Sequence, residues 1–299
     1  TREEPSRARI MVQASSAKLL SEILHAIQPH GASVENERDC RLAAAPADGI
    51  FHDEFYATTH LPTQLRVRDQ WVEVEGIEMD LGILVDQVRL TARTVPMGEV
   101  KQGDQVVTGR DGVRVIPLQR PRDRDVFSFM ESQVSSERPH GRVIGDIAKR
   151  LVQLRIGFRE GKAGNKVLLA GGPAIVHAGG REALAWLIDE EFIHVLFCGN
   201  ALPAHDMEVD LYGTSLGYGH AAGRVVPHGH EHHLRTINRI RAIGSIEAAV
   251  RSGVVKTGIM AACVRRGVQV VMAGTIRDDG PLPGVITDSL EAQAAMRVA

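Results

Sequence analysis

The stretch KVLLAGGPAIVHAGGREALAWLIDEEFIHVLFCGN, residues 166–200, decides the fold of the second half of this chain. An apolar run at 167–170 enters a glycine-rich turn, and a second apolar run at 194–197 ends at Cys198-Gly199-Asn200. Between them, apolar residues recur at helical spacing: Ala183, Leu184, Leu187 and Ile188. The order predicts a strand, a loop, a helix and a second strand. In a parallel sheet, the glycine-rich loop of such a unit is where a phosphate-bearing cofactor usually binds.

The rest of the second half continues this alternation of strands and helices. The spacing of apolar residues predicts helices over 145–156, 232–243, 245–251 and 258–265, and a strand over 268–273. Asp288, with Glu291 three residues later, is typical of the start of a last helix. Alternating strands and helices predict a parallel sheet covered on both faces.

The first half reads differently. A strand over 8–14 and a helix over 16–28, capped at Gly31, form a small α/β opening. Residues 70–117 contain five short apolar runs broken by turn residues and predict a β-rich element, with Asp111-Gly112 as a hairpin turn. The apolar runs are 71–74, 81–85, 88–95, 105–108 and 113–116.

Two segments of the first half have no clear periodicity. Residues 42–65 are irregular and contain Phe51, Phe55 and Tyr56, so they are either a surface loop or a loop that contacts a ligand or an interface. Residues 119–125 form a charged linker. We therefore predict an α/β protein with two domains: a small N-terminal α/β and β-rich domain (1–126) and a parallel-sheet domain (127–299).

Composition limits the classes of function. The chain has 299 residues, 35 Lys and Arg against 37 Asp and Glu, and a net charge of −2, which gives no reason to expect nucleic acid or an acidic membrane as a partner. No apolar run approaches the roughly 18–20 residues of a spanning helix, and the charged first ten residues do not resemble a secretory signal. Three isolated cysteines, with no CxxC pair, favour reduced thiols in the cytoplasm.

Three loops that follow predicted strands are candidate binding sites. Small residues at 171–180 would let backbone N–H groups approach a pyrophosphate, although G-x-G-x-x-G is absent and an ordinary turn explains the loop as well. Gly199-Asn200-Ala201, with His205 and Asp206, could bind ribose hydroxyls or simply start a helix. Arg277-Asp278-Asp279-Gly280 exceeds what a turn requires, and a carboxylate there could orient an ammonium or act as a base.

Two further segments carry polar groups with chemical potential. His228-Gly-His230-Glu-His232-His233 suggests zinc, but Pro227 and Gly229 argue against the helix that the His228–His232 spacing needs. Proton transfer by His232 or His233 is the stronger interpretation, and exposed histidines are the plain alternative. The segment 135–139, SSERP, is a helix cap or a contact between domains.

Taken together, these segments resemble the LOR/SDH bifunctional enzyme conserved-domain family. That family includes archaeal NAD-dependent ornithine cyclodeaminases and the C-terminal half of cyanobacterial arginine dihydrolase/ornithine cyclodeaminase fusions. The second domain is also similar to the Rossmann-like NAD-binding fold of deoxyhypusine synthase. The matching runs are PADGIFHDEFYATTH (46–60), SSERP (135–139), GGPAIVHAGG (171–180), CGNALPAHDMEVDLYGTSLG (198–217), HHLRTINRIRAIGSI (232–246) and AGTIRDDGPLPGVITD (273–288).

The resemblance implies an NAD-dependent conversion of L-ornithine to L-proline and ammonia. Hydride leaves the α-carbon, the δ-amine closes the ring as ammonia departs, and the cyclic imine takes the hydride back. It implies NAD contacts from Ala174, Ile175, His177, Ala178, Gly179, Gly199, Asn200, Ala201, Asp206 and Asp278. Asp279 is the expected ammonium-orienting carboxylate or base, with Arg277, His232 and His233 as further catalytic residues, and Arg138, Glu137 and Tyr56 as substrate contacts.

The resemblance leaves alternatives open. Family members continue past the last helix with further strands, so we expect this chain to be a fragment or a shortened homologue. The His-rich segment 228–231 is not part of the family pattern. Another NAD-dependent reaction on an amino acid or polyamine, a non-catalytic binding module and a zinc hydrolase at 228–233 are the rival hypotheses. We expect no metal, a small amino-acid substrate, and a homodimer or homotetramer.

Overall fold

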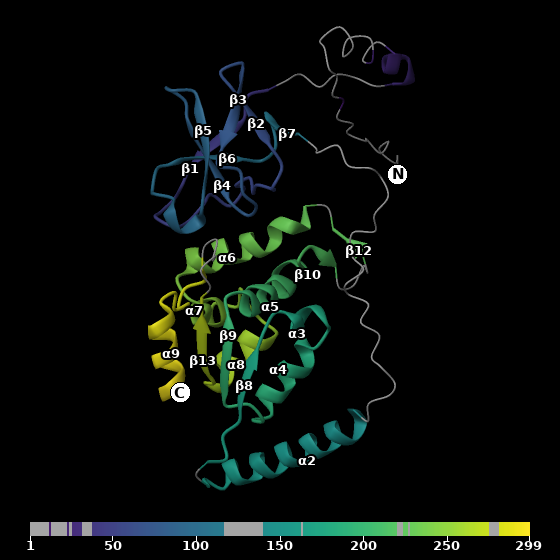
Figure 1. Cartoon of the computed structure of the whole chain (residues 1–299), viewed down its shortest axis with the longest axis vertical. Coiled ribbons are helices and arrows are strands. Elements are labelled where there is room, and N and C mark those ends of the chain that lie inside the picture. The colour runs from purple at the N-terminus through teal and green to yellow at the C-terminus, as the bar shows by residue number, and fades with distance from the viewer. Residues whose placement is uncertain are drawn as a thin grey trace. The chain divides into compact units, whose positions relative to one another are not determined.

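A computed structural model gives the fold of this chain (Figure 1). It describes residues 12, 23, 26–31, 38–116, 140–162, 164–219, 224–226, 228–274 and 281–299, which fall into two compact units, 1–38 and 39–299. In the first unit, a 3₁₀ turn, η1 (Gln28–His30), ends at Gly31 with φ of 86°, as expected for a residue that terminates a helix. Most of the predicted strand 8–14 and most of the predicted helix 16–28 lie outside the described residues.

The second unit opens with a curled seven-stranded sheet (Figure 1). Its strands lie in the order β1-β6-β4-β5-β3-β2-β7, and β3 with β5 is the parallel pair among antiparallel neighbours. Leu65, Ile83 and Val107 are fully buried in its core. The strands are β1 (Arg41–Ala44), β2 (Thr63–Val67), β3 (Gln70–Glu75), β4 (Gly82–Asp86), β5 (Thr91–Val95), β6 (Gln105–Thr108) and β7 (Val113–Val115), with η2 (Met97–Glu99) between β5 and β6. The predicted β-rich element is confirmed.

Two details of that prediction were wrong. Asp111-Gly112 is not a hairpin turn, because β6 pairs with β1 and β4 whereas β7 pairs with β2. The apolar run 88–95 is a strand only from Thr91, since Asp86 Oδ1 accepts hydrogen bonds from the backbone N–H groups of Val88 and Arg89 (2.9 and 3.0 Å) and holds a turn there. In both places, pairing and local side-chain bonding outweigh the apolar pattern.

The second half contains a three-stranded parallel sheet in the order β13-β9-β8 (Figure 1). The strands are β8 (Leu168–Gly171), β9 (Val195–Gly199) and β13 (Gln269–Ala273). The helices are α2 (His140–Arg159), α3 (Ala174–His177), α4 (Arg181–Asp189), α5 (Ala201–Tyr212), α6 (His232–Ile243), α7 (Ile246–Arg251), α8 (Ile259–Arg266) and α9 (Ser289–Val298). A small antiparallel sheet, β10 (Thr214–Ser215), β11 (Tyr218–Gly219) and β12 (Arg224–Val225), and the 3₁₀ turn η3 (Gly229–Glu231) lie between α5 and α6.

The predicted order of strands and helices in this half is confirmed, including the last helix. Asp288 caps α9, and its Oδ1 accepts hydrogen bonds from the backbone N–H groups of Leu290 and Glu291 (2.9 and 2.8 Å). The predicted domain boundary at residue 126 falls between 116 and 140, outside the described residues, and stays a prediction.

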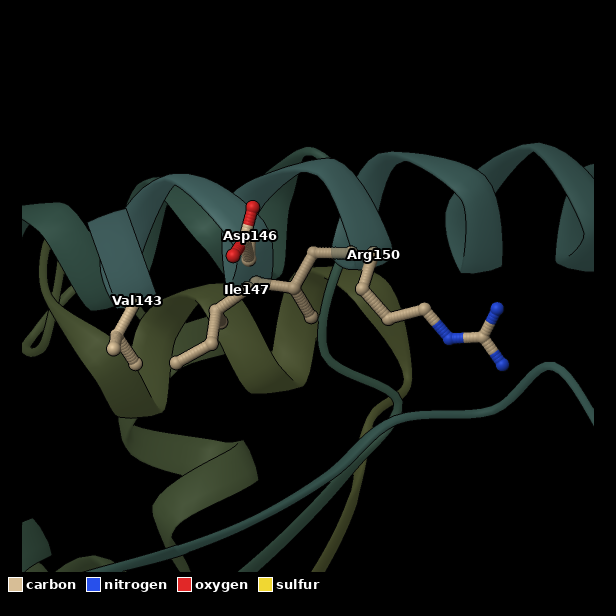
Figure 2. Close-up of a pocket in the computed structure, with 5 residues that line it drawn as sticks. Val143, Asp146, Ile147 and Arg150 are labelled. Carbon is tan, nitrogen blue, oxygen red and sulfur yellow. The ribbon is translucent and has the colours of Figure 1, made fainter. Parts of the chain in front are cut away.

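Helix α2 forms where apolar spacing predicts a helix, but several of its apolar side chains are exposed in the described part of the chain. Val143, Ile147 and Ile156 are each more than half exposed. Figure 2 shows Val143 and Ile147, with Asp146 and Arg150, along a shallow recess on this helix. The recess is lined by residues of α2 alone and lies on a different element from the strand ends where a ligand was expected.

The irregular segment 45–62 is part of the protein core. Phe51 and Phe55 are each 1% exposed, and their ring centroids are 4.8 Å apart. Buried Asn238 of α6 makes two hydrogen bonds with the backbone of Phe51: Oδ1 accepts from its N–H (2.8 Å), and Nδ2 donates to its carbonyl (3.0 Å). The surface-loop interpretation was therefore wrong, because Phe51 and Phe55 are buried and lie against α6.

Two arginines of α6 extend this contact. Arg235 donates to the carbonyl oxygens of Asp53 and Phe55 (2.5 and 3.1 Å), and Arg241 donates to that of Gly49 (2.6 Å). Residues of one helical face thus supply donors to backbone carbonyls that no strand partner satisfies. These contacts join the segment before β2 to the parallel-sheet half.

Replacing Asn238 with alanine tests how much this contact stabilises the fold. The change leaves a buried N–H and a buried carbonyl of Phe51 without their partner, so we expect the free energy of unfolding to fall by about 2–4 kcal/mol. Urea denaturation followed by circular dichroism measures the difference. Arg239→Ala on the exposed side of α6 is the matched control and should change stability little. Equal stability of Asn238→Ala and the parent chain would contradict this role.

Candidate functional site

The three candidate loops of the sequence begin at one edge of the parallel sheet. In the strand register, Gly171 is opposite Cys198, and Gly199 is opposite Ala273. The loops that begin at 172, 200 and 274 therefore leave the sheet side by side. This arrangement follows from parallel pairing, and it brings together segments separated by up to a hundred residues in sequence.

The first loop, 171–180, presents small and accessible groups. Ala174, Ala178 and Gly179 are exposed, and a side chain added at Gly172 would meet no atom within 4 Å. Ile175 and His177 are partly buried on the short helix α3. The backbone here can be approached closely by a ligand, as the sequence predicts for a phosphate-binding loop.

The second loop starts at Gly199 and is tied to the third. Asn200 Oδ1 accepts a hydrogen bond from the backbone N–H of Leu282 (2.9 Å), just after the loop that follows β13. Gly199, Asn200 and Ala201 are all partly exposed. The amide of Asn200 is thus fixed at the sheet edge by a contact with a distant segment.

Asp206, predicted to contact the cofactor, lies inside the protein. Its side chain is 0% exposed, and its Oδ1 accepts a hydrogen bond from Arg181 Nε (2.8 Å). Its two oxygens also accept from the backbone N–H groups of Ile259 and Met260 at the start of α8 (2.9 and 2.8 Å). Burial raises the pKa of Asp206, and Arg181 and the two N–H groups oppose that shift. The carboxylate thus joins α4, α5 and α8, and the cofactor contact stays a prediction.

A cluster of histidines surrounds a second buried carboxylate, Glu208, on the same helix. His205 Nδ1 lies 2.9 Å from Glu208 Oε2, and Thr214 Oγ1 donates to Glu208 Oε1 (2.8 Å). Thr214 Oγ1 is also 2.7 Å from His232 Nδ1. The next residue, Ser215, bonds His177 Nδ1 of the first loop (2.7 Å). The cluster therefore reaches from the loop 171–180 to the start of α6.

The surroundings set the charge of this cluster. Burial acts to raise the pKa of Glu208, but hydrogen bonds from His205, Thr214 and the Gly217 amide together hold it below its ordinary value. Burial lowers the pKa of His232. Near neutral pH, the cluster thus contains an ionised carboxylate and a neutral imidazole.

Comparisons with known proteins identify the family of this chain. A family model described as "Arginine dihydrolase ArgZ-like, C-terminal, Rossmann fold" matches residues 145–299. Models for the first region of the same C-terminal part and for the "LOR/SDH bifunctional enzyme conserved region" match 62–144 and 1–61. An ornithine cyclodeaminase of Methanothermobacter thermautotrophicus is 48% identical over 99% of this chain and 71% of its own length. The chain belongs to this ornithine cyclodeaminase family.

Other relatives and solved structures agree with this assignment. The bifunctional arginine dihydrolase/ornithine cyclodeaminase AgrE of Nostoc is 39% identical over 98% of this chain and 42% of its own length. The crystal structure of AgrE in a ternary complex with ornithine and NAD⁺ matches 87% of this chain and 35% of that one, with a TM-score of 0.74 and 38% identity. A conserved LOR/SDH protein from Methanococcus maripaludis matches 89% of this chain and 77% of that one, with a TM-score of 0.53 and 41% identity.

In this member of the ornithine cyclodeaminase family, Tyr56, a predicted substrate contact, lies inside the seven-stranded sheet. It is 3% exposed and packs in the core of the seven-stranded sheet, with the Arg110 guanidinium 5.6 Å from its ring centroid. Burial raises the pKa of its hydroxyl. The aromatic ring belongs to the core of that sheet, and the substrate contact stays a prediction.

Several other predicted residues stay predictions. Arg277, Asp278 and Asp279 fall within 275–280, and Glu137 and Arg138 within 117–139, both outside the described residues. His233 is described, and its Nε2 lies 3.6 Å from Asp80 Oδ2 beside β4. In the part of the chain that the structure describes, no group of three His, Cys, Asp or Glu side chains could hold a metal ion. No helix among the described residues has the length and apolarity needed to cross a membrane.

Sequence reasoning missed Glu208, Thr214 and Ser215, and it gave His205 no separate role. His205 and Glu208 are three residues apart on a helix, which places them on the same face, but this spacing is common. Thr214 and Ser215 form the two-residue strand β10, which carries no periodic pattern. Only the fold brings them to His177 and His232.

Replacing Asp206 with alanine tests its structural role. The change leaves the Arg181 guanidinium buried without its carboxylate and removes the acceptor of the first two N–H groups of α8, so we expect a loss of about 3–5 kcal/mol in the free energy of unfolding. Urea denaturation measures it. Asp189→Ala breaks the partly exposed pair with Arg265 and should cost much less. A purified Asp206→Ala chain as stable as Asp189→Ala would show that the buried pair is not needed.

Proposed function

We propose that this chain is an NAD-dependent ornithine cyclodeaminase that converts L-ornithine to L-proline and ammonia. The observation that carries the proposal is the extended similarity to named enzymes: five archaeal ornithine cyclodeaminases are 41–48% identical over nearly the whole chain. The similar AgrE structure contains ornithine and NAD⁺. The open, small-residue loop at the sheet edge supports the same function in this chain.

The described residues at the sheet edge fit a dinucleotide. The loop 171–180 would approach the pyrophosphate through its backbone, with Ala174, Ile175, His177, Ala178 and Gly179 as contacts. Because Asn200 Oδ1 is held by the Leu282 N–H, its amide nitrogen is the group that would donate to a ribose hydroxyl. Gly199 and Ala201 would flank it. Asp206 supports this wall from behind, through Arg181.

The protein's own groups must handle the protons of the substrate amines. Nicotinamide, when bound, would supply the hydride chemistry, taking hydride from the α-carbon and returning it to the same carbon after ring closure. Removal of the α-hydrogen as hydride requires a neutral α-amine, and ring closure requires a neutral δ-amine. His232, neutral near pH 7 because burial lowers its pKa, is the proposed proton acceptor among the described residues. Asp279 and Arg277 remain the proposed contacts for the substrate ammonium and carboxylate.

An assay with deuterated substrate tests the reaction. Purified chain with NAD⁺ and L-ornithine deuterated at the α-carbon should release ammonia and form proline that keeps deuterium at its α-carbon, with no net reduction of NAD⁺. Mass spectrometry of the proline and an ammonia assay measure this. Lysine, arginine and spermidine, assayed under the same conditions, serve as comparison substrates.

The other outcomes separate the alternatives. Turnover of another member of the panel, with ornithine inert, would replace the substrate but keep the NAD chemistry. No turnover of any substrate, together with no NAD binding by calorimetry, would point to a non-catalytic module. Either outcome contradicts the ornithine proposal. A homodimer or homotetramer in the cytoplasm stays part of the proposal.

A further inference from the structure

Glu208 is the most heavily hydrogen-bonded carboxylate in the described histidine cluster. It is 0% exposed and accepts from the backbone N–H groups of Leu216 (3.2 Å) and Gly217 (3.3 Å), one on each carboxylate oxygen. His205 and Thr214 occupy the remaining positions. A carboxylate that meets four donors is held in its ionised form, in which it can only accept hydrogen bonds.

That charge state fixes the direction of every hydrogen bond in the chain of contacts. An ionised Glu208 has no proton to give, so the single hydroxyl proton of Thr214 points to Glu208. The 2.7 Å contact between Thr214 Oγ1 and His232 Nδ1 then needs a proton from the imidazole. His232 must carry its proton on Nδ1, and in the neutral ring Nε2 is left as the acceptor.

The ring of His232 is also held in place from its face. Tyr212 stacks on it, with ring centroids 4.7 Å apart and an interplanar angle of 20°. Stacking opposes rotation of the imidazole, which would exchange the positions of the two nitrogens. Thr214 therefore determines the tautomer of His232, and Tyr212 keeps the plane of its imidazole ring fixed.

We propose that Glu208 and Thr214 are positioning residues that hold neutral His232 as its Nδ1–H tautomer, so that Nε2 accepts a proton from a substrate amine. The inference rests on the proposed function for the reaction, but the tautomer itself does not depend on activity. The proton acquired at Nε2 gives an imidazolium whose positive charge Glu208 stabilises through Thr214. The role parallels the general use of a carboxylate to orient a histidine base.

Glu208 also connects His232 to the loop 171–180, which is the proposed site of the cofactor pyrophosphate. His205 Nδ1 donates to Glu208 Oε2, and the His205 ring lies edge-on to His177, with centroids 4.8 Å apart. His177 in turn bonds Ser215, the neighbour of Thr214 in β10. A single buried charge therefore orients side chains on both sides of the cluster.

The pH dependence follows from the groups that face His232. Burial lowers its pKa, Arg235 and His233 act in the same direction, and the negative charges of Glu208 and Glu231 oppose them. Because neutral His232 is the active form, activity should fall as the pH drops through a pKa below the ordinary value of about 6.5. Removing the charge of Glu208 lowers that pKa further, so the acidic limb of the kcat profile should move to lower pH.

The first test reads the tautomer directly. In chain labelled with ¹⁵N-histidine, long-range ¹H–¹⁵N spectra at pH 8 distinguish Nδ1–H from Nε2–H, and His232→Gln identifies the signals of His232 among the 13 histidines. We expect Nδ1–H in the parent chain and in Thr214→Ser, which keeps the hydroxyl. We expect Nε2–H, or a mixture, in Thr214→Val, which removes it.

The second test measures turnover with the same variants. Thr214→Val should lower kcat roughly 10- to 100-fold, part of the ~10²- to 10⁴-fold that acid–base catalysis supplies, and leave KM nearly unchanged. Thr214→Ser should restore most of kcat, and Glu208→Gln, where it folds, should move the acidic limb. Thr63→Val is the matched control, because it removes a buried hydroxyl that donates to the carbonyl of Leu61, away from the histidine cluster.

The outcomes separate this inference from the proposed reaction. A parent chain that makes proline with His232 as the Nε2–H tautomer overturns the positioning role. So does a Thr214→Val chain with unchanged kcat and unchanged tautomer. A parent chain that shows Nδ1–H but makes no proline contradicts the proposed reaction, and with it the catalytic role given to His232.

Discussion

The contact on which the two halves of this unit depend is made between one face of α6 and the backbone of residues 49–55. Arg235, Asn238 and Arg241 follow one another at intervals of three residues, and they bond the segment in the reverse direction, from residues 53–55 back to Gly49. An irregular buried segment must have its backbone groups satisfied, and side chains do here what a neighbouring strand would do elsewhere. Arg241 also donates to the carbonyl of Pro281 (2.7 Å), so the same helix anchors the chain just after the third candidate loop. The position of His232, at the first turn of α6, follows from how firmly this helix is held.

Helix α5 explains how two buried carboxylates two positions apart in sequence can have different roles. Asp206 and Glu208 are separated by two residues, about 200° around the helix, so they point to opposite sides. Asp206 meets a permanent cation and the start of α8, which makes its environment structural. Glu208 meets a histidine, a hydroxyl and two amides, and only this second set contains groups that can exchange protons. The desolvation cost of each buried carboxylate is offset because each accepts hydrogen bonds from several donors.

The sequence predicted what depends on local pattern and on the geometry of parallel sheets. Strand and helix order in the second half was correct, and the meeting of the loops after β8, β9 and β13 followed from the rule that parallel strands end at one edge. Predictions failed where a distant partner decides. Phe51 and Phe55 were expected in a surface loop or a ligand-contacting loop, but they are buried beside α6. Asp111-Gly112 was expected to be a hairpin turn, but β7 pairs with β2. The ion pair between Asp206 and a buried arginine of α4 likewise joins distant segments, and no sequence pattern indicated it.

The histidine cluster shows why a site of this kind is hard to find from sequence. Each member has an ordinary explanation alone: His205 and Glu208 could be a surface pair on a helix, and Thr214 and Ser215 could be a turn after Gly213. Their chemical role depends on the direction of the hydrogen bonds between them. The single proton of a hydroxyl goes to the carboxylate, and the hydroxyl oxygen then accepts from the imidazole, only if the carboxylate is ionised, buried and fully hydrogen-bonded. The direction of these hydrogen bonds depends on the burial of Glu208, which results from the packing of β10 and α6 against α5. That packing depends in turn on the contact between α6 and residues 49–55. The proton chemistry proposed for His232 is therefore coupled to residues 49–55, because both depend on the placement of α6.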